Sequence, residues 1–98
     1  MAVIFVSRRT DSDPAGYAEA AAEMEQEVAR APGYLGHDSL SSADGSGITI
    51  SYWQDHSSAA AWRDHARHSQ VRASGRKHWY HWYRLVVADV ARAYDWQK

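Results

Sequence analysis

The residues of this sequence best suited to chemistry include two histidines set at helical spacing. His65 and His68 lie three positions apart, so one face of a helix would carry both imidazoles. A neutral imidazole can accept a proton at about pH 7 and act as a general base, for example toward a phenol. We therefore take His65 and His68 as the candidate catalytic residues. The alternative is a structural role, as a helix cap or through a bond to a backbone carbonyl.

Arg72 and Arg76, four positions apart, would share a helical face in the same way. Paired guanidinium groups can hold an anionic or enolate-bearing substrate, and a solvated basic face is the simpler alternative. Four aromatic residues are candidates to line a pocket for a flat ligand: Trp62, Tyr52, Trp79 and Tyr80. Tyr52 or Tyr80, together with an arginine, would stabilise the anion formed by deprotonation. The alternative for the tryptophans is a place in the core or in a subunit interface.

Most of these candidates fall within residues 51–83, which contain four of the five tryptophans and five of the six histidines. The spacing of His65 and His68 could also serve a metal, but the local sequence supplies no third ligand, so we expect none. The chain has no cysteine, which excludes disulfides and thiolate chemistry. It has no phosphate-binding glycine loop or dinucleotide fingerprint, and its net charge of -1 does not favour nucleic acid as a partner.

The elements that would position these residues follow from hydrophobic periodicity and turn residues. We predict strands over 2–7, 34–42, 47–54 and 84–95, a helix over 14–30, and a helical region that begins near Ser58. That helical region is expected to break near His65 and Ala66 into a short helix and a longer one that ends around Gly75 to His78. The resulting order is β-α-β-β-α-β.

That order predicts an α+β protein of the ferredoxin-like class, with a four-stranded antiparallel sheet and both helices on one face. The 98 residues make one domain, spanning 1–98. Aromatic residues in the strands, among them Phe5, Trp53 and Tyr94, exceed what a solvent-facing sheet should carry. We therefore expect a homodimer in which two sheets pack face to face or form a barrel.

The N-terminal apolar run is too short to span a membrane, and its basic residues follow the run rather than precede it as in a signal peptide. We therefore expect a soluble, cytoplasmic protein with no membrane partner.

Two segments resemble a known family. They are GYLGHDSL at 33–40 and ITISYWQDHSSAAAWRDHARHSQVRASGRKHWYHWYRLVVADVARAY at 48–94. With Pro32-Gly33-Tyr34 before the second strand, Tyr52-Trp53 at the end of the third and Trp62 in the helical region, the chain resembles the antibiotic biosynthesis monooxygenase family. The resemblance covers nearly the whole chain and implies a dimeric ferredoxin-like α+β barrel. Members include cofactor-independent oxygenases of aromatic polyketides, haem-degrading monooxygenases and quinol oxygenases.

The haem-degrading branch of the family implies an Asn in the first strand, a Trp in the helical region and a proximal His further along the long helix. Trp62 matches this pattern, but the first strand MAVIFVS has no Asn. Arg72 and Arg76 stand near the place where the His is expected, and a shifted alignment would offer His78 instead. Haem therefore stays open as an alternative, and the expected cofactor is none.

Two classes of function follow from the residues and the resemblance together. In the first, the protein is a monooxygenase without metal or flavin, and O2 reacts directly with a deprotonated, electron-rich aromatic such as a phenol, a hydroquinone or a polyketide-like molecule. In the second, the same pocket only binds a small aromatic or lipid-like ligand, or the domain is a dimeric module without chemistry. The partners expected in the first case are the small aromatic molecule, O2 and a second copy of the chain.

Overall fold

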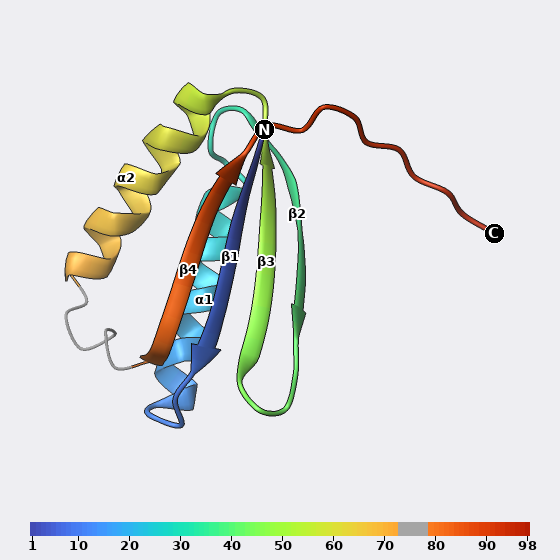
Figure 1. Cartoon of the computed structure of the whole chain (residues 1–98). Coiled ribbons are helices and arrows are strands. Elements are labelled where there is room, and N and C mark those ends of the chain that lie inside the picture. Colours follow the sequence, from blue (N-terminus) through green and yellow to red (C-terminus); the bar gives the residue numbers. More distant parts are fainter. Residues whose placement is uncertain (73–78) are drawn as a thin grey trace.

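The computed structural model contains a four-stranded antiparallel sheet with two helices on one of its faces (Figure 1). The structure describes the backbone of residues 1–72 and 79–98, and the side chains of the same residues except 67–72. The elements are β1 (Ala2–Arg9), α1 (Pro14–Val28), β2 (Tyr34–Ser41), β3 (Ser46–Trp53), α2 (His56–Arg72) and β4 (Tyr80–Ala88). Their order and the strand order β2-β3-β1-β4 confirm the predicted ferredoxin-like fold.

The first helix begins where the sequence predicts. Asp13 adopts a left-handed backbone conformation at φ 48°, and its side chain accepts a hydrogen bond of 3.1 Å from the backbone N–H of Gly16. Pro14 occupies the first turn, where the absence of an N–H costs nothing. Gly33, with φ 81°, lies in the turn between α1 and β2, in a conformation that other residues rarely adopt.

The predicted break in the second helix is wrong. α2 runs without interruption from His56 to Arg72, and the backbone N–H of Ser58 donates to the Asp55 carboxylate at 2.8 Å, which caps the first turn. Residues 56–72 include neither glycine nor proline, so nothing in them ends a helix near His65. The predicted end around Gly75 to His78 lies outside the described residues.

The predicted bounds of the last strand are also wrong. β4 begins at Tyr80 rather than Arg84 and ends at Ala88 rather than Asp95. Its pairing partner sets both limits, because β1 begins at Ala2, directly opposite Ala88, and offers no backbone groups beyond that point. Residues 89–98 form neither helix nor strand and extend away from the sheet (Figure 1).

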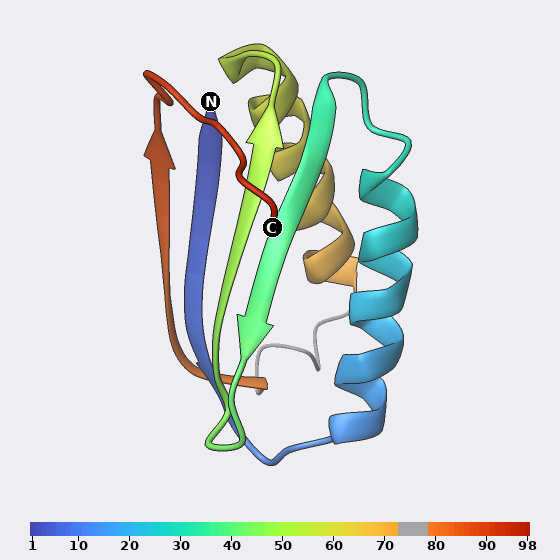
Figure 2. The same cartoon turned by 90° about the vertical axis from the view of Figure 1, so that its right-hand side faces the viewer.

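Side chains alternate between the two faces of the sheet, which we call the helix face and the open face. Figure 2 shows both helices on the same side of the sheet. In β1, Phe5 belongs to the helix face, because its ring lies within 5.6 Å of Tyr80, whose ring in turn lies 6.1 Å from Tyr17 of α1. Ile4 and Val6 therefore belong to the open face.

Cross-strand neighbours share a face, so the register extends this assignment to the other strands. Together with Ile4 and Val6, the open face carries Leu40, Ile48, Ile50, Trp82 and Val86. Leu40 is 82% exposed and Trp82 48% exposed. The open face is thus largely apolar, as predicted, but the aromatics named for it lie elsewhere. Phe5 and Trp53 are on the helix face, and Tyr94 lies beyond the last strand.

The buried residues lie mainly between the helices and the sheet. Trp53 is 1% exposed and packs between Tyr34, at a ring distance of 5.4 Å, and Trp62 of α2, at 6.4 Å. The other buried apolar residues are Ala2, Ala20, Ala59 and Trp79. Since most of these side chains are small, Trp53 supplies much of the apolar area that holds α2 against the sheet.

We expect the change Trp53→Ala to lower the free energy of unfolding by about 3–5 kcal/mol, because it removes a buried ring and leaves a cavity. Leu35→Ala, at a position that is 67% exposed, should change it by no more than about 0.5 kcal/mol. Urea unfolding followed by far-ultraviolet circular dichroism measures both. Equal losses in the two variants would mean that Trp53 does not anchor α2.

Candidate functional site

The candidate residues lie at two separate ends of the helix face. One end contains Trp62 and His65 of α2, and the other contains Trp79 and Tyr80 at the start of β4. In Figure 1, α2 descends from one end of the sheet and β4 begins at the opposite end. The residues that the sequence concentrates in one stretch are therefore not one cluster.

At the first end, α2 is joined to α1 by a histidine and a carboxylate. His65 Nε2 lies 3.0 Å from Glu27 Oε2, and the His65 ring lies 5.3 Å from the ring of Trp62. The partner of His65 is thus a carboxylate. It is neither a helix terminus nor a backbone carbonyl, the partners expected for a purely structural role. When Nε2–H donates to Glu27, Nδ1 carries the lone pair, and this tautomer can act as a base. The His65 side chain is 49% exposed, so it does not lie in an enclosed pocket.

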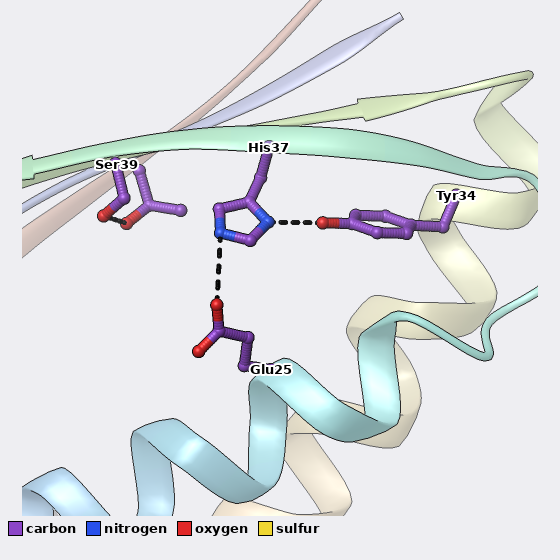
Figure 3. A network of polar contacts seen from close by, with 5 residues as sticks. Glu25, Tyr34, His37 and Ser39 are labelled. Carbon is purple, nitrogen blue, oxygen red and sulfur yellow. Dashed lines mark hydrogen bonds and ion pairs between the residues drawn. The ribbon is translucent and has the colours of Figure 1, made fainter.

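A second polar network lies beside it and was missed by the sequence analysis (Figure 3). The Tyr34 hydroxyl hydrogen-bonds to His37 Nδ1, and His37 Nε2 faces Glu25 of α1 at 3.8 Å. Burial, and then the negative charge of Glu25, raise the pKa of Tyr34 above its usual value. Tyr34 therefore keeps its proton and donates it to His37. Strand alternation was the available signal, since it places His37 and Ser39 on one face of β2.

At the other end, aromatic rings gather around Tyr80. The Tyr80 ring lies 5.6 Å from Phe5, 6.0 Å from Tyr83 and 6.1 Å from Tyr17 of α1. Trp79 is 8% exposed and meets Tyr17 edge-on at 5.5 Å. A register shift between Arg8 and Arg9 sets Tyr80 directly opposite Arg9 and thus directs its ring to the helix face.

Burial is the main reason that the pKa of Tyr80 is raised well above its usual value. The charge of ionised Tyr17 and a hydrogen bond to Tyr17 act in the same direction, and the positive charge of Arg9 opposes them. Tyr80 is therefore a neutral hydroxyl donor across the physiological range.

Two cavities open at this end, and Arg9 and Tyr17 line both. The smaller has a volume of about 150 Å³ and is lined by Phe5, Ser7, Arg9, Tyr17, Ser39, Leu40, Ser41, Gly47, Ile48 and Thr49. The larger, of about 240 Å³, is lined by Arg9, Thr10, Asp11, Ser12, Pro14, Tyr17, Ala43, Asp44, Gly45 and Trp79. Of the predicted site residues whose side chains the structure describes, only Trp79 lines either cavity. Arg9 escaped the sequence analysis because residues 8–13 were expected to form a loop, whereas β1 extends to Arg9.

Tyr52 lies apart from both ends. It belongs to the open face, where its hydroxyl donates to the Asp38 carboxylate at 2.9 Å, and this bond is the main reason that its pKa is raised.

The side chains of His68 and Arg72 and the whole of Arg76 lie outside the described residues. No group of three or more histidine and acidic residues that could hold a metal occurs among the residues that the structure describes.

The family model for antibiotic biosynthesis monooxygenases matches residues 1–74. YqjZ, an uncharacterised protein of Bacillus subtilis, is 43% identical over 91 residues, covering 93% of this chain and 79% of its own. These matches show that the chain belongs to the antibiotic biosynthesis monooxygenase family.

Solved structures agree in fold. A putative antibiotic biosynthesis monooxygenase from Nitrosomonas europaea has a TM-score of 0.74 at 18% identity, over 92% of this chain and 88% of its own. SnoaB, a cofactor-independent oxygenase from Streptomyces nogalater, has a TM-score of 0.62 at 25% identity, over 92% of this chain and 95% of its own. Membership of this family supports a monooxygenase-like role for the chain.

We expect Tyr80 to stay protonated at pH 10, where a solvent-exposed tyrosine is half ionised. The raised pKa stabilises the folded state below that pH, and this contribution is lost as the pH rises and the unfolded chain ionises. Tyrosinate absorbance during an alkaline titration, with the Tyr80→Phe variant as the reference, measures this. The titration step missing from the variant should lie above pH 10. A missing step at or below pH 10 would show that Tyr80 is solvated.

Proposed function

We propose that the protein is a cofactor-independent monooxygenase acting on an electron-rich aromatic molecule such as a phenol, a hydroquinone or a polyketide-like substrate. The observation that carries this proposal is the pair of cavities on the helix face, which combine aromatic walls with the guanidinium of Arg9. Family membership supports it, and so does the relative SnoaB, whose name describes a cofactor-independent oxygenase. Pockets for small molecules are commonly apolar with a few convergent polar groups.

The reaction needs no external reductant. One oxygen atom of O2 bonds to a ring carbon, and the substrate gives up two electrons and two protons that leave with the other oxygen atom as water. The substrate must first lose a proton, because its anion is the species rich enough in electrons to react with O2. The protein then has three tasks, which are to bind the ring, to favour the anion and to exclude other reactants.

We propose His65 as the base, since its contact with Glu27 favours a tautomer with a free lone pair at Nδ1. Trp62, which stacks between Trp53 and His65, would support the substrate ring beside it. His68, Arg72 and Arg76 stay predicted site residues of α2 and the segment after it.

Haem fits the described part of the site poorly. A tetrapyrrole is several times larger than a single aromatic ring, whereas the cavities measure about 150 and 240 Å³. In addition, His37, His56 and His65 each face a carboxylate through Nε2. We therefore derive no step through haem and propose a reaction without a cofactor.

We also propose a homodimer formed through the open face. Leu40, Ile48 and Val86 are 82%, 46% and 40% exposed there, and apolar surface of this kind on a sheet commonly marks an interface. The C-terminal segment 89–98 supports a second copy as the partner. It extends from the sheet with Tyr94 and Trp96 86% and 80% exposed, and a second subunit would cover both. Among the described residues, no helix is long and apolar enough to cross a membrane.

Oxygen uptake by the purified, chelator-treated protein should accompany turnover of at least one member of a panel of hydroquinones and anthrones, with label from ¹⁸O2 in the product. His65→Gln should lower kcat for the fused-ring anthrones by about 100-fold or more, as expected for loss of a general base. His56→Gln is the matched control, because His56 belongs to the same helix and also faces a carboxylate, that of Asp89 at 2.6 Å. It should behave as the parent.

Two results would contradict the proposed activity. Quenching of tryptophan fluorescence by the panel without oxygen uptake would indicate a binding protein. A Soret band that saturates at one haemin per chain, with activity only in that form, would indicate the haem-dependent branch.

Val86→Lys should convert the dimer into a monomer, because it places a charge among the apolar side chains of the open face. Val87→Lys is the matched control, since both valines are 40% exposed but Val87 lies opposite Val3 on the helix face. Light scattering after size-exclusion chromatography should give a dimer for the parent and for Val87→Lys. A monomeric parent at micromolar concentration, or equal effects of the two changes, would refute the open-face interface.

A further inference from the structure

Arg9 is a cation on the helix face. It lines two cavities and forms no ion pair with a described carboxylate. Its guanidinium carbon lies 4.5 Å from the centre of the Tyr17 ring, and its side chain lines both cavities. Each ion pair found among the described side chains involves a histidine, so none of their carboxylates lies within 4.0 Å of the Arg9 guanidinium. A half-buried guanidinium that is paired only with a ring retains hydrogen-bond donors for a ligand.

A second donor stands beside it. The Tyr80 ring lies 6.1 Å from the ring of Tyr17, and a hydrogen bond between the two hydroxyls contributes to the raised pKa of Tyr80. Tyr17 also lines the smaller cavity, and its hydroxyl can donate to a ligand there when Tyr80 is the donor of the bond between them. Arg9 is close enough to this pair for its charge to lower the pKa of Tyr80. The cation and the two hydroxyls therefore lie within one small region.

The composition of the two cavities decides which one an anion would enter. The larger cavity is lined by Asp11 and Asp44, and hydrogen bonds from Ser42 and Ser46 lower the pKa of Asp44 to about 2, so that it is ionised. The lining of the smaller cavity contains no acid. It consists of Arg9, two rings, four hydroxyl side chains and one glycine, together with Leu40 and Ile48, whose side chains belong to the open face. An anion is therefore favoured in the smaller cavity.

The volume of the smaller cavity, about 150 Å³, suits one aromatic ring. An apolar cavity of roughly 150 Å³ is known to accept benzene. Phe5 and Tyr17 contribute aromatic rings to the lining, and Ser39 and Thr49, joined at 2.9 Å, contribute polar atoms. The ligand that matches this cavity is a single ring carrying one ionised oxygen.

We propose that Arg9 and Tyr17 form the binding site for the ionised oxygen of a phenol whose ring occupies the smaller cavity. This identification of the ligand as a substrate rests on the proposed function, whereas the binding itself requires no turnover. Binding the anion more tightly than the neutral phenol shifts the ionisation of the bound phenol, so the site promotes deprotonation through differential affinity.

The site also limits which substrates can reach His65. Thr49 lines the smaller cavity, and Trp53, which contacts Trp62, lies four residues further along the same strand, roughly 13 Å away. A single ring held by Arg9 is too short to span that distance. Only a substrate of several fused rings could be held at Arg9 and also approach His65.

The test uses 4-nitrophenol, because its phenolate absorbs visible light and its ring is too poor in electrons to be a good substrate. Adding the intact protein at a pH below the pKa of free 4-nitrophenol should increase phenolate absorbance in a saturable manner. Arg9→Met, which keeps an unbranched side chain but removes the charge, should weaken phenolate binding at least 10-fold. Tyr17→Phe should weaken it less, and Arg9→Lys should retain part of the affinity.

Arg8→Met is the matched control. Arg8 is the adjacent arginine of the same strand, but it lies opposite Trp82 on the open face. It should bind 4-nitrophenolate as the parent does. The neutral ether 4-nitroanisole, which has the same ring, should bind all variants equally weakly. Thermal melts of each variant exclude unfolding as the cause of lost binding.

Three results would overturn the proposal. They are the absence of a phenolate shift in the parent protein, an equal loss of affinity in Arg8→Met and folded Arg9→Met, and equal affinity of the parent for 4-nitroanisole and 4-nitrophenolate. Oxygen uptake is measured separately. A phenolate shift without turnover of any phenol would therefore leave the anion site established and the monooxygenase proposal refuted.

Discussion

The central strand β1 is paired along its length with β3 on one side and with β4 on the other, and this register decides which side chains meet. Phe5 stands opposite both Thr49 and Leu85, so all three belong to the helix face. A slip of one residue would turn Phe5 toward the open face and Ile4 toward the helices. The same alternation separates Arg8 from Arg9, so that two adjacent arginines serve opposite faces of one sheet.

Small side chains on the helix face explain why the smaller cavity exists beside Tyr17. Trp53 fills the opposite end of the face, whereas Ser7, Ser39 and other small residues line the space between sheet and helix. Among the helical side chains that the structure describes, the buried ones are Ala20 and Ala59, which cannot fill that space either. A core built from leucine and isoleucine at these positions would be more stable and would have no room for a ligand.

Two acidic residues of α1 face histidines on other elements. Glu27 meets His65 of α2, and Glu25 faces His37 of β2. Both pairs are partly exposed, so each contributes little to stability. Their value lies in orienting the imidazoles, because a carboxylate beside one ring nitrogen determines which nitrogen carries the proton. At the other end of the face, Arg9 packs on Tyr17 instead of on an acid and keeps its charge available.

Local sequence was sufficient to predict the order of the helices and strands and where most of them begin and end. Asp13-Pro14 starts α1, Asp55 precedes α2, and the turn around Asp44-Gly45 joins β2 to β3. The signals are local, because caps and turns are satisfied by residues within a few positions of one another. Family membership was also accessible, since 33–40 and 48–94 carry the pattern and the family model matches 1–74.

The features that depend on pairing between distant residues were decided only by the tertiary structure. β4 ends at Ala88 because β1 has no residue left to pair with, although Val90 and Tyr94 continue a strand-like composition. The pairing register separates Tyr52 from Tyr80, and the packing of α1 on the sheet brings Tyr17 to Arg9. By itself, the sequence determined the fold and the chemical character of its residues. Which of them meet in a site was decided by contacts between residues far apart in the chain, and local periodicity does not contain that information.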